Sequence, residues 1–399
     1  MINFNNKWIN GALPALFIHS CIGSVYCWSL LKGDIASAMN VDVSNIEFAF
    51  TLAIFFLGMS AAFGGRLVEK NVRKASFISM IAFTSGLLLS CVSIQLGNPS
   101  MLFLTYGMIM GIGLGIGYLS PVKTLMLWFK DNKGLATGIA ISGFGLSKML
   151  FSPYIEWCNS TFGIMTTLVT MSIFSAILMS VAAYFIKKPE EWIEVKDKFS
   201  FKKAFSIITN YTYIKIWTIF FINITCGLVL ISFEKNIALD SGIEVGSIAL
   251  VASMTAMFNT LGRLGYSTLS DYVVKKERIY NIIFISSAVC CFFFPLTGGN
   301  LIALIVLLMV VNLGYGGGFS TMPILIGSKF GMQNLSVLHG FVLTAWSWGS
   351  VAAFIITQVL IYEAGVSYET LVIFLCLLYV IALIISLRIS KTEIKQLAA

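Results

Sequence analysis

Long apolar stretches separated by short polar loops dominate the pattern of this chain. Twelve of them are long enough to cross a hydrocarbon core of about 30 Å as helices. They cover residues 8–31, 46–64, 75–96, 100–126, 134–157, 165–186, 213–233, 246–268, 279–298, 301–326, 335–361 and 369–388. Membrane β-strands would instead alternate apolar and polar residues over about ten positions, and these stretches do not. The pattern predicts an all-α membrane protein with twelve transmembrane helices.

The two halves of the chain repeat the same features at an offset of 202 residues. The related pairs are Glu69 and Asp271, Arg73 and Lys275, Gly115 and Gly317, Pro121 and Pro323, and Gly138 and Gly340. Several matches in one order indicate a duplicated unit of about 200 residues, a construction that many secondary transporters share. We therefore expect two six-helix pseudo-repeats at residues 1–187 and 213–399, joined by a cytoplasmic linker at 188–212.

Composition and charge support a membrane protein and predict its orientation. The chain is 58% hydrophobic and 11% charged, whereas about 25% of an average soluble domain is charged. Loops on one face hold 20 of the 26 Lys and Arg residues, and the other face holds Lys32 and Lys235. The positive-inside rule then places both termini in the cytoplasm and the protein in the cell membrane. We interpret the net charge of +8 as a sign of membrane orientation. The expected partner is membrane lipid, and no nucleic-acid binding is expected.

The sequence offers little for cofactor or enzyme chemistry. Its eight cysteines lie within or beside apolar stretches and lack metal-ligand spacing, so we expect neither a metal nor a cofactor. A membrane enzyme would need a nucleophile with a base, or a metal cluster, and neither pattern is evident. The first apolar run is too long for a typical signal core, so the first span is expected to stay.

Two basic residues lie far from either predicted membrane surface. Arg263 is eight residues from Asp271, about 12 Å deep at helical rise. Lys148 is fourteen residues past Gly134, about 21 Å from that surface. Burying each cation costs at least about 2.5 kcal/mol, and we expect no carboxylate at comparable depth. The two cations predict a water-filled cavity for an anion, and an arginine fork suits a carboxylate. Packing against backbone carbonyls stays an alternative for Arg263, and Lys148 could equally extend to the outer surface.

Aromatic and polar side chains near these cations are candidates for the cavity wall. Two glycine-rich spans, 111–118 and 314–319, place rings where thin helices would let them project inward. The ring candidates are Tyr26, Trp28, Tyr118, Tyr315, Phe319 and Trp346. His19 lies in the middle of the first span, where an imidazole could bind substrate or carry a coupling proton, because it titrates near neutral pH. A packing role explains His19 equally well. His339 and Lys123 are expected at the membrane interface.

Residues 65–74 resemble the loop G-x-x-x-D-R-x-G-R-R that the major facilitator superfamily carries between its second and third helices. Glu69 replaces Asp in this copy, and Val72 replaces Gly. The second copy, residues 267–276, keeps Asp271. The resemblance implies the major facilitator fold. It also assigns Glu69, Arg73, Asp271 and Lys275 to a cytoplasmic gate.

A narrower resemblance is to the oxalate:formate antiporter family, which includes monocarboxylate transporters. It rests on residues 23–30, 143–145, 259–263 and 270–271 and on the glycine-rich part of the tenth span up to Pro323. This resemblance implies that Arg263 binds the substrate carboxylate, with Asn259 one turn before it. Oxalate exchangers carry a lysine after Thr-Ala in the eleventh helix, where Trp346 stands here. Animal proton-coupled carriers have an aspartate at the position of Asn259.

We therefore expect a monomeric secondary transporter that moves a small carboxylate by alternating access. A monocarboxylate such as lactate, pyruvate or formate is favoured, and protons are an open coupling partner. The expected substrate-binding set is Arg263, Lys148, His19, Tyr26, Trp28, Tyr118, Asn259, Tyr315, Phe319 and Trp346. Exchange of oxalate or another dicarboxylate for formate, carriage of another small solute, and a transporter-like sensor remain alternatives.

Overall fold

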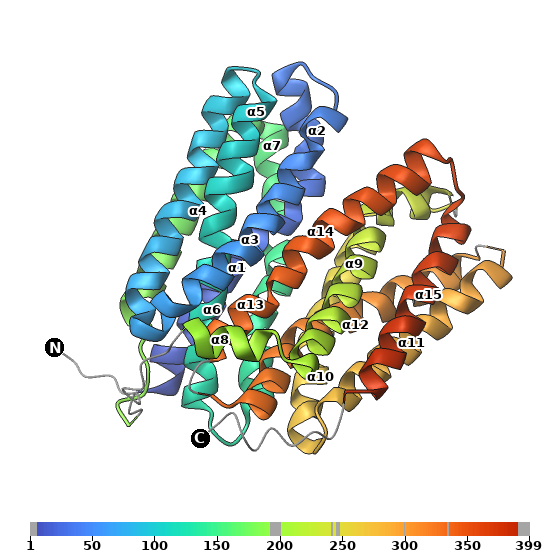
Figure 1. The fold of residues 1–399 in the computed structure, drawn as a ribbon. Coiled ribbons are helices and arrows are strands. Elements are labelled where there is room, and N and C mark those ends of the chain that lie inside the picture. Colours follow the sequence, from blue (N-terminus) through green and yellow to red (C-terminus); the bar gives the residue numbers. More distant parts are fainter. Residues whose placement is uncertain are drawn as a thin grey trace.

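The computed structural model describes residues 6–191, 201–240, 242–244, 248–298, 300–332 and 335–389. Every regular element within these ranges is a helix. Figure 1 shows two bundles side by side, the first coloured blue to green and the second yellow to red.

The first bundle is built from six membrane-length helical segments within the described ranges. The first combines η1 (Trp8–Ala12), α1 (Leu13–Ile22), η2 (Gly23–Cys27) and α2 (Trp28–Met39). Next come α3 (Ser44–Lys70), α4 (Val72–Gln95), and a fourth segment of α5 (Pro99–Leu102), η3 (Phe103–Met110) and α6 (Gly111–Trp128). The fifth and sixth share α7 (Lys133–Phe185), which breaks at Gly163, where φ is 82° and ψ is 169°. Glycine tolerates this positive φ without a steric penalty.

The second bundle repeats this plan after the short helix α8 (Phe201–Ile208). Its segments are α9 (Tyr211–Asp240), α10 (Ile248–Tyr272), α11 (Glu277–Leu296), α12 (Leu301–Phe330), the run of α13 (Leu335–Val342), α14 (Thr344–Thr357) and η5 (Gln358–Glu363), and α15 (Tyr368–Leu387).

The helix count agrees with the sequence prediction. Ten segments in the described chain are long and apolar enough to cross a membrane; α7 counts once among them, and the polar α10 is not included. When α7 is counted as two segments and α10 is added, the total is twelve. The all-α, twelve-helix fold class is confirmed.

Short polar side chains begin several of these helices and fix where the chain turns. The side chain of Asn71 accepts a hydrogen bond from the backbone N–H of Lys74 at the start of α4. Asn98 caps α5 in the same way, and Asn300 caps α12. Each cap satisfies a backbone donor that has no partner within its helix.

The two bundles meet along two seams related by the 202-residue repeat. One seam joins α7 to α10, and the other joins α3 to α13 and α14. A Cβ atom at Gly340 would lie 2.3 Å from the carbonyl oxygen of Ala61, and one at Gly138 would lie 3.0 Å from that of Arg263. Because Gly138 corresponds to Gly340 and Ala61 to Arg263, glycine permits the same close approach in both seams.

Candidate functional site

Arg263 lies on α10 and is completely buried. Its Nε donates to Oδ1 of Asn259 at 2.7 Å, and its Nη1 donates to the carbonyl oxygen of Ile141 in the other half at 3.3 Å. Its Nη2 makes no hydrogen bond within the part of the chain that the structure describes. Because buried donors are normally paired, this guanidinium retains donor capacity for a ligand.

Two phenyl rings, one from each half, lie against the guanidinium. The Cζ atom of Arg263 is 5.7 Å from the ring centroid of Phe144 and 5.4 Å from that of Phe319. The buried ring of Trp346 packs 4.3 Å from Phe319 and 6.0 Å from Phe144. Tyr118 packs 5.6 Å from Phe144. The rings exclude water around the cation and add cation–π attraction.

His19 contacts the same group of rings. Its ring centroid lies 5.2 Å from that of Tyr118 and 5.5 Å from that of Phe144. Nε2 is 3.1 Å from the carbonyl oxygen of Tyr118, and Nδ1 bonds to that of Ala140. Both ring nitrogens therefore face backbone carbonyl oxygens of the first half, although the ring lies beside the arginine's neighbours.

A pair of tyrosines bridges the halves next to Arg263. The hydroxyls of Tyr26 and Tyr315 are 3.3 Å apart. Tyr26 packs 5.7 Å from Phe144, and Tyr315 packs 5.1 Å from Phe319. Trp28 instead packs on Tyr106 at 4.8 Å. The structure thus gathers the expected rings around Arg263, with the exception of Trp28.

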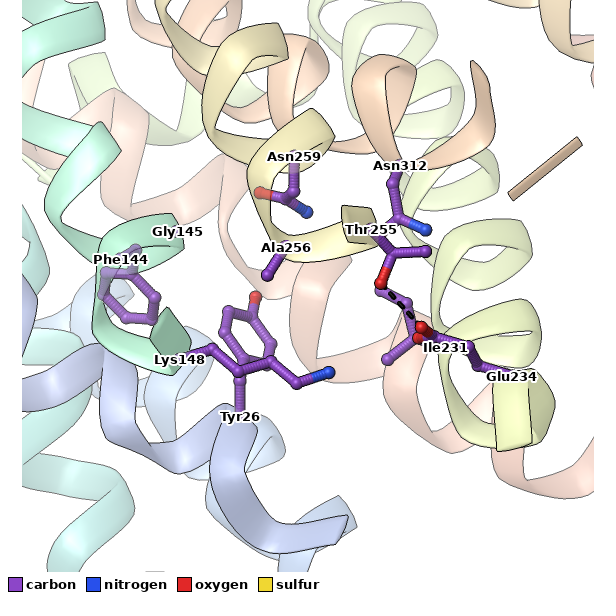
Figure 2. Close-up of a pocket in the computed structure, with 10 residues that line it drawn as sticks. All are labelled: Tyr26, Phe144, Gly145, Lys148, Ile231, Glu234, Thr255, Ala256, Asn259 and Asn312. Atoms are coloured by element: carbon purple, nitrogen blue, oxygen red, sulfur yellow. Dashed lines mark hydrogen bonds between the residues drawn. The ribbon is translucent and has the colours of Figure 1, made fainter. Parts of the chain in front are cut away.

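A pocket between the halves lies beside this group (Figure 2). Its lining residues are Tyr26, Phe144, Gly145, Lys148, Ile231, Glu234, Thr255, Ala256, Asn259 and Asn312. Its volume of about 30 Å³ has room for very few water molecules. Arg263 does not line the pocket itself, but its partner Asn259 and its neighbour Phe144 do.

The expectation that no carboxylate lies near the deep cations is wrong. Glu234 is buried and lines the same pocket as Lys148. Its Oε1 accepts a hydrogen bond of 2.6 Å from the Thr255 hydroxyl. The apolar stretch predicted at 213–233 stops one residue before Glu234, whereas α9 continues as a helix to Asp240. Helix continuation therefore brings a residue expected in an outer loop into the pocket.

Two acidic side chains link the halves at the opposite end of the bundle, which we call the Asp271 end. The Asp271 carboxylate accepts hydrogen bonds from the backbone N–H groups of Gly134 at 2.7 Å and Leu135 at 3.0 Å. Glu69 accepts one from the backbone N–H of Ser336 at 2.9 Å. A carboxylate at a helix N-terminus is favoured by the unpaired N–H groups and the helix dipole.

The basic residues expected to share this gate lie elsewhere. Arg73 Nε donates to the carbonyl oxygen of Ile186 in its own half at 3.1 Å. Lys275 lines a separate pocket with Arg278 and Arg388. The structure therefore brings Glu69 and Asp271 to the facing half, but neither Arg73 nor Lys275 to these carboxylates.

Two residues expected at the membrane interface are instead buried. Lys123 forms an ion pair of 3.2 Å with Glu69 and donates to the carbonyl oxygen of Met332 in the other half at 2.8 Å. His339 packs 5.8 Å from Tyr118. Glu69 and the rings provide these two side chains with partners that depth along one helix does not reveal.

Comparison with known proteins identifies the family. The sequence model of the Major Facilitator Superfamily matches residues 5–354. The chain belongs to the major facilitator superfamily. The predicted resemblance to this family is confirmed. Members of this family are multi-pass membrane transporters of small molecules and not enzymes.

Solved structures of superfamily members have the same fold. The proton:xylose symporter XylE superposes with a TM-score of 0.76 at 12% identity, covering 98% of this chain and 96% of that chain. The transporter FucP in its outward conformation gives a TM-score of 0.72 at 16% identity, covering 96% and 98%. At these identities the likeness concerns the fold.

Sequence relatives include carriers of carboxylates. The chain is 27% identical over 353 residues to the uncharacterised transporter YhjX of Escherichia coli K12, covering 86% of both. It is 24% identical to the oxalate:formate antiporter of Oxalobacter formigenes, over 87% of this chain and 83% of that protein. It is 21% identical to apicoplast pyruvate carrier 1 of Toxoplasma gondii, over 86% of this chain and 82% of the carrier.

Proposed function

We propose that this chain is a secondary transporter of a small monocarboxylate such as lactate, pyruvate or formate. The observation that supports it best is the buried Arg263, whose Nη2 has no hydrogen-bond partner among the described residues and which lies between rings from both halves. A carboxylate can accept charge-assisted hydrogen bonds from such a group. Relatives named for oxalate:formate exchange and for pyruvate carriage support this class of substrate.

The transport cycle is alternating access of two rigid halves, residues 1–187 and 213–399. Substrate enters through the pocket that contains Lys148 and Glu234 and separates the Tyr26 and Tyr315 hydroxyls to reach Arg263. The seams at the Asp271 end then part and release the substrate there. The protein lies in a cell membrane, and its basic loops orient the Asp271 end and both termini toward the cytoplasm. Glu69 and Asp271 act as latches of this end, with Lys123 as a partner of Glu69.

An uptake panel tests this proposal. Purified protein in liposomes is offered labelled formate, acetate, lactate, pyruvate, oxalate and malonate at two pH values, which also reveals coupling to protons. Arg263→Ala should lower affinity at least about a hundredfold, because each hydrogen bond to a charged group contributes about 1.5–3 kcal/mol. Arg263→Lys should restore little, because the planar fork is lost.

The control is Arg278→Ala, which removes a basic residue beside the separate pocket of Lys275. It should leave uptake unchanged. Wild-type uptake by Arg263→Ala, or the absence of uptake for every acid on the panel, would contradict the proposal.

A second candidate is exchange of a dicarboxylate for formate. The position of Lys148 favours it, because this second cation lines the same pocket as Asn259, the hydrogen-bond partner of Arg263. The same panel distinguishes the two, since oxalate and malonate would then be taken up in preference to lactate.

A further inference from the structure

One face of α10 connects the acidic and basic groups of the cavity. Thr255, Asn259 and Arg263 follow one another at intervals of four residues, so their side chains lie on one face of the helix. Thr255 donates to Glu234 at 2.6 Å, and Asn259 accepts from Arg263 at 2.7 Å. Glu234 is therefore tied to the same helix face that carries the substrate-binding arginine.

The carboxyl group of Glu234 accepts a short hydrogen bond from Thr255. Distances of about 2.5–2.7 Å are usual when a hydroxyl donates to a carboxylate anion. Lys148 lines the same pocket from α7 in the other half, and Figure 2 shows its ammonium pointing across the pocket toward the side where Glu234 lies.

We propose that Glu234 makes the cavity selective for monoanions by neutralising Lys148. This inference rests on the proposed carboxylate transport. With Arg263 and Lys148 positive and Glu234 negative, the cavity carries one net positive charge, which a monocarboxylate balances. A dicarboxylate would leave one net negative charge in a poorly hydrated site and would place its second carboxylate near Glu234. Such repulsion is far stronger there than in water.

The neighbouring charged groups do not alter this balance. Lys32 and Glu47 line an adjoining pocket between the halves. Their ion pair of 2.6 Å contributes no net charge. Lys148 alone would favour a dianion, so Glu234 is the residue that decides between the two substrate classes.

Charge variants in liposomes test the inference, with lactate and malonate as probes. Glu234→Gln keeps the side-chain shape and leaves two net positive charges, so malonate affinity should rise at least about tenfold relative to lactate. Lys148→Gln leaves no net charge, so lactate affinity should fall about tenfold while malonate stays excluded. The double variant Glu234→Gln/Lys148→Gln restores one positive charge and should recover the preference for lactate. A merely structural role for either residue would not be rescued by the second substitution. Each tenfold change in affinity corresponds to about 1.4 kcal/mol of binding free energy.

Lys32→Gln/Glu47→Gln is the matched control, since it removes the ion pair of the adjoining pocket without a change in net charge and should leave the ratio of malonate to lactate unchanged. If the wild type carries lactate and Glu234→Gln keeps the wild-type ratio, the inference is overturned while the proposed function stands. If Glu234→Gln does not insert into membranes, Lys148→Gln provides the test. A lactate affinity of Lys148→Gln equal to that of the wild type would also overturn the inference. A wild type that carries none of the acids on the uptake panel refutes the proposed function, and the inference with it.

Discussion

The carboxylate of Asp271 at the end of α10 accepts a hydrogen bond of 2.7 Å from the backbone N–H of Gly134 at the start of α7. The repeat places an equivalent contact in the other seam. Glu69 and Ser336 are each 202 residues from Asp271 and Gly134, and they are joined by a hydrogen bond of 2.9 Å. Each half therefore provides an acid that caps a helix of the other half, and both caps must break when the Asp271 end opens.

Asp271→Asn should slow transport while leaving the apparent affinity nearly unchanged. The amide retains one acceptor oxygen, but the negative charge at the helix N-terminus is lost. The expected cost is about 1–2 kcal/mol, which favours an open Asp271 end by about tenfold. Initial uptake rates across substrate concentrations measure the effect.

Asp131→Asn is the control for this variant, because exposed Asp131 lies in the same pocket at this end and makes none of the cap contacts shown by Asp271. A change in affinity with an unchanged maximal rate would contradict the role of Asp271 as a latch.

Glu69→Gln should destabilise the protein more than Asp271→Asn. It removes the carboxylate next to Lys123, whose side chain is only 1% exposed. Breaking a buried ion pair costs about 3 kcal/mol, and the 19% exposure of Glu69 makes this an upper value. Glu69→Gln/Lys123→Met should recover much of the loss, because no cation is then left buried. Thermal unfolding in detergent measures both.

Glu191→Gln provides the comparison, since its ion pair with Lys130 is exposed at 80% and 55%. An exposed pair of this kind contributes at most about 1 kcal/mol. Equal losses of melting temperature in the two single variants would show that burial of Lys123 does not matter.

The fold was predictable because each transmembrane span can be recognised from its own residues. A run of apolar residues long enough to cross a membrane is visible without knowing its neighbours, and a charge such as Arg263 within that run stands out. The partners of such a charge are set by packing between distant segments. Lys123 meets Glu69 and Met332 only because α3, α6 and α12 converge at one end, and no local pattern encodes that meeting.

Glu234 illustrates the same limit at the end of a helix. Hydrophobicity ends at residue 233, so the sequence alone places Glu234 in a loop. The hydrogen bond from Thr255 satisfies the carboxylate while α9 continues beyond it. The signal that could have revealed it is the spacing of Thr255 and Asn259 ahead of Arg263, which marks a polar face on α10.

Asn259→Ala should weaken lactate binding about tenfold at an unchanged maximal rate. The amide oxygen orients Nε of Arg263 at 2.7 Å, and a hydrogen bond to a charged group contributes about 1.5–3 kcal/mol. Asn259→Asp should weaken binding further, because its carboxylate would compete with the substrate for the guanidinium. Concentration dependence of lactate uptake separates these effects.

Asn312→Ala is the matched control for Asn259. Asn312 lines the same pocket, but its side chain donates to the carbonyl oxygen of Leu308 on its own helix at 2.9 Å. It should leave the affinity within about twofold of wild type, since the lost hydrogen bond lies within α12 and does not involve Arg263. Equal weakening by both alanine variants would contradict the orienting role of Asn259.

Gly340→Ala should shift the protein toward a state with an open Asp271 end. The new Cβ would lie 2.3 Å from the carbonyl oxygen of Ala61. Because that atom belongs to the backbone of α3, no side-chain rotation relieves the clash and the seam must separate. Overpacking of this kind typically costs about 1–3 kcal/mol. Spin labels at the exposed positions 70 and 328, one in each half, should report a longer distance.

The repeat supplies a graded comparison for this last variant. At Gly138 the nearest atom to a new Cβ is the hydroxyl oxygen of Ser267 at 2.4 Å, which can rotate away, and the backbone oxygen of Arg263 is 3.0 Å distant. Gly138→Ala should therefore lengthen the distance less than Gly340→Ala. Gly265→Ala, where a Cβ would meet no atom within 4 Å, should leave it unchanged. If all three variants gave the wild-type distance, close backbone approach in the seams would not hold the Asp271 end closed.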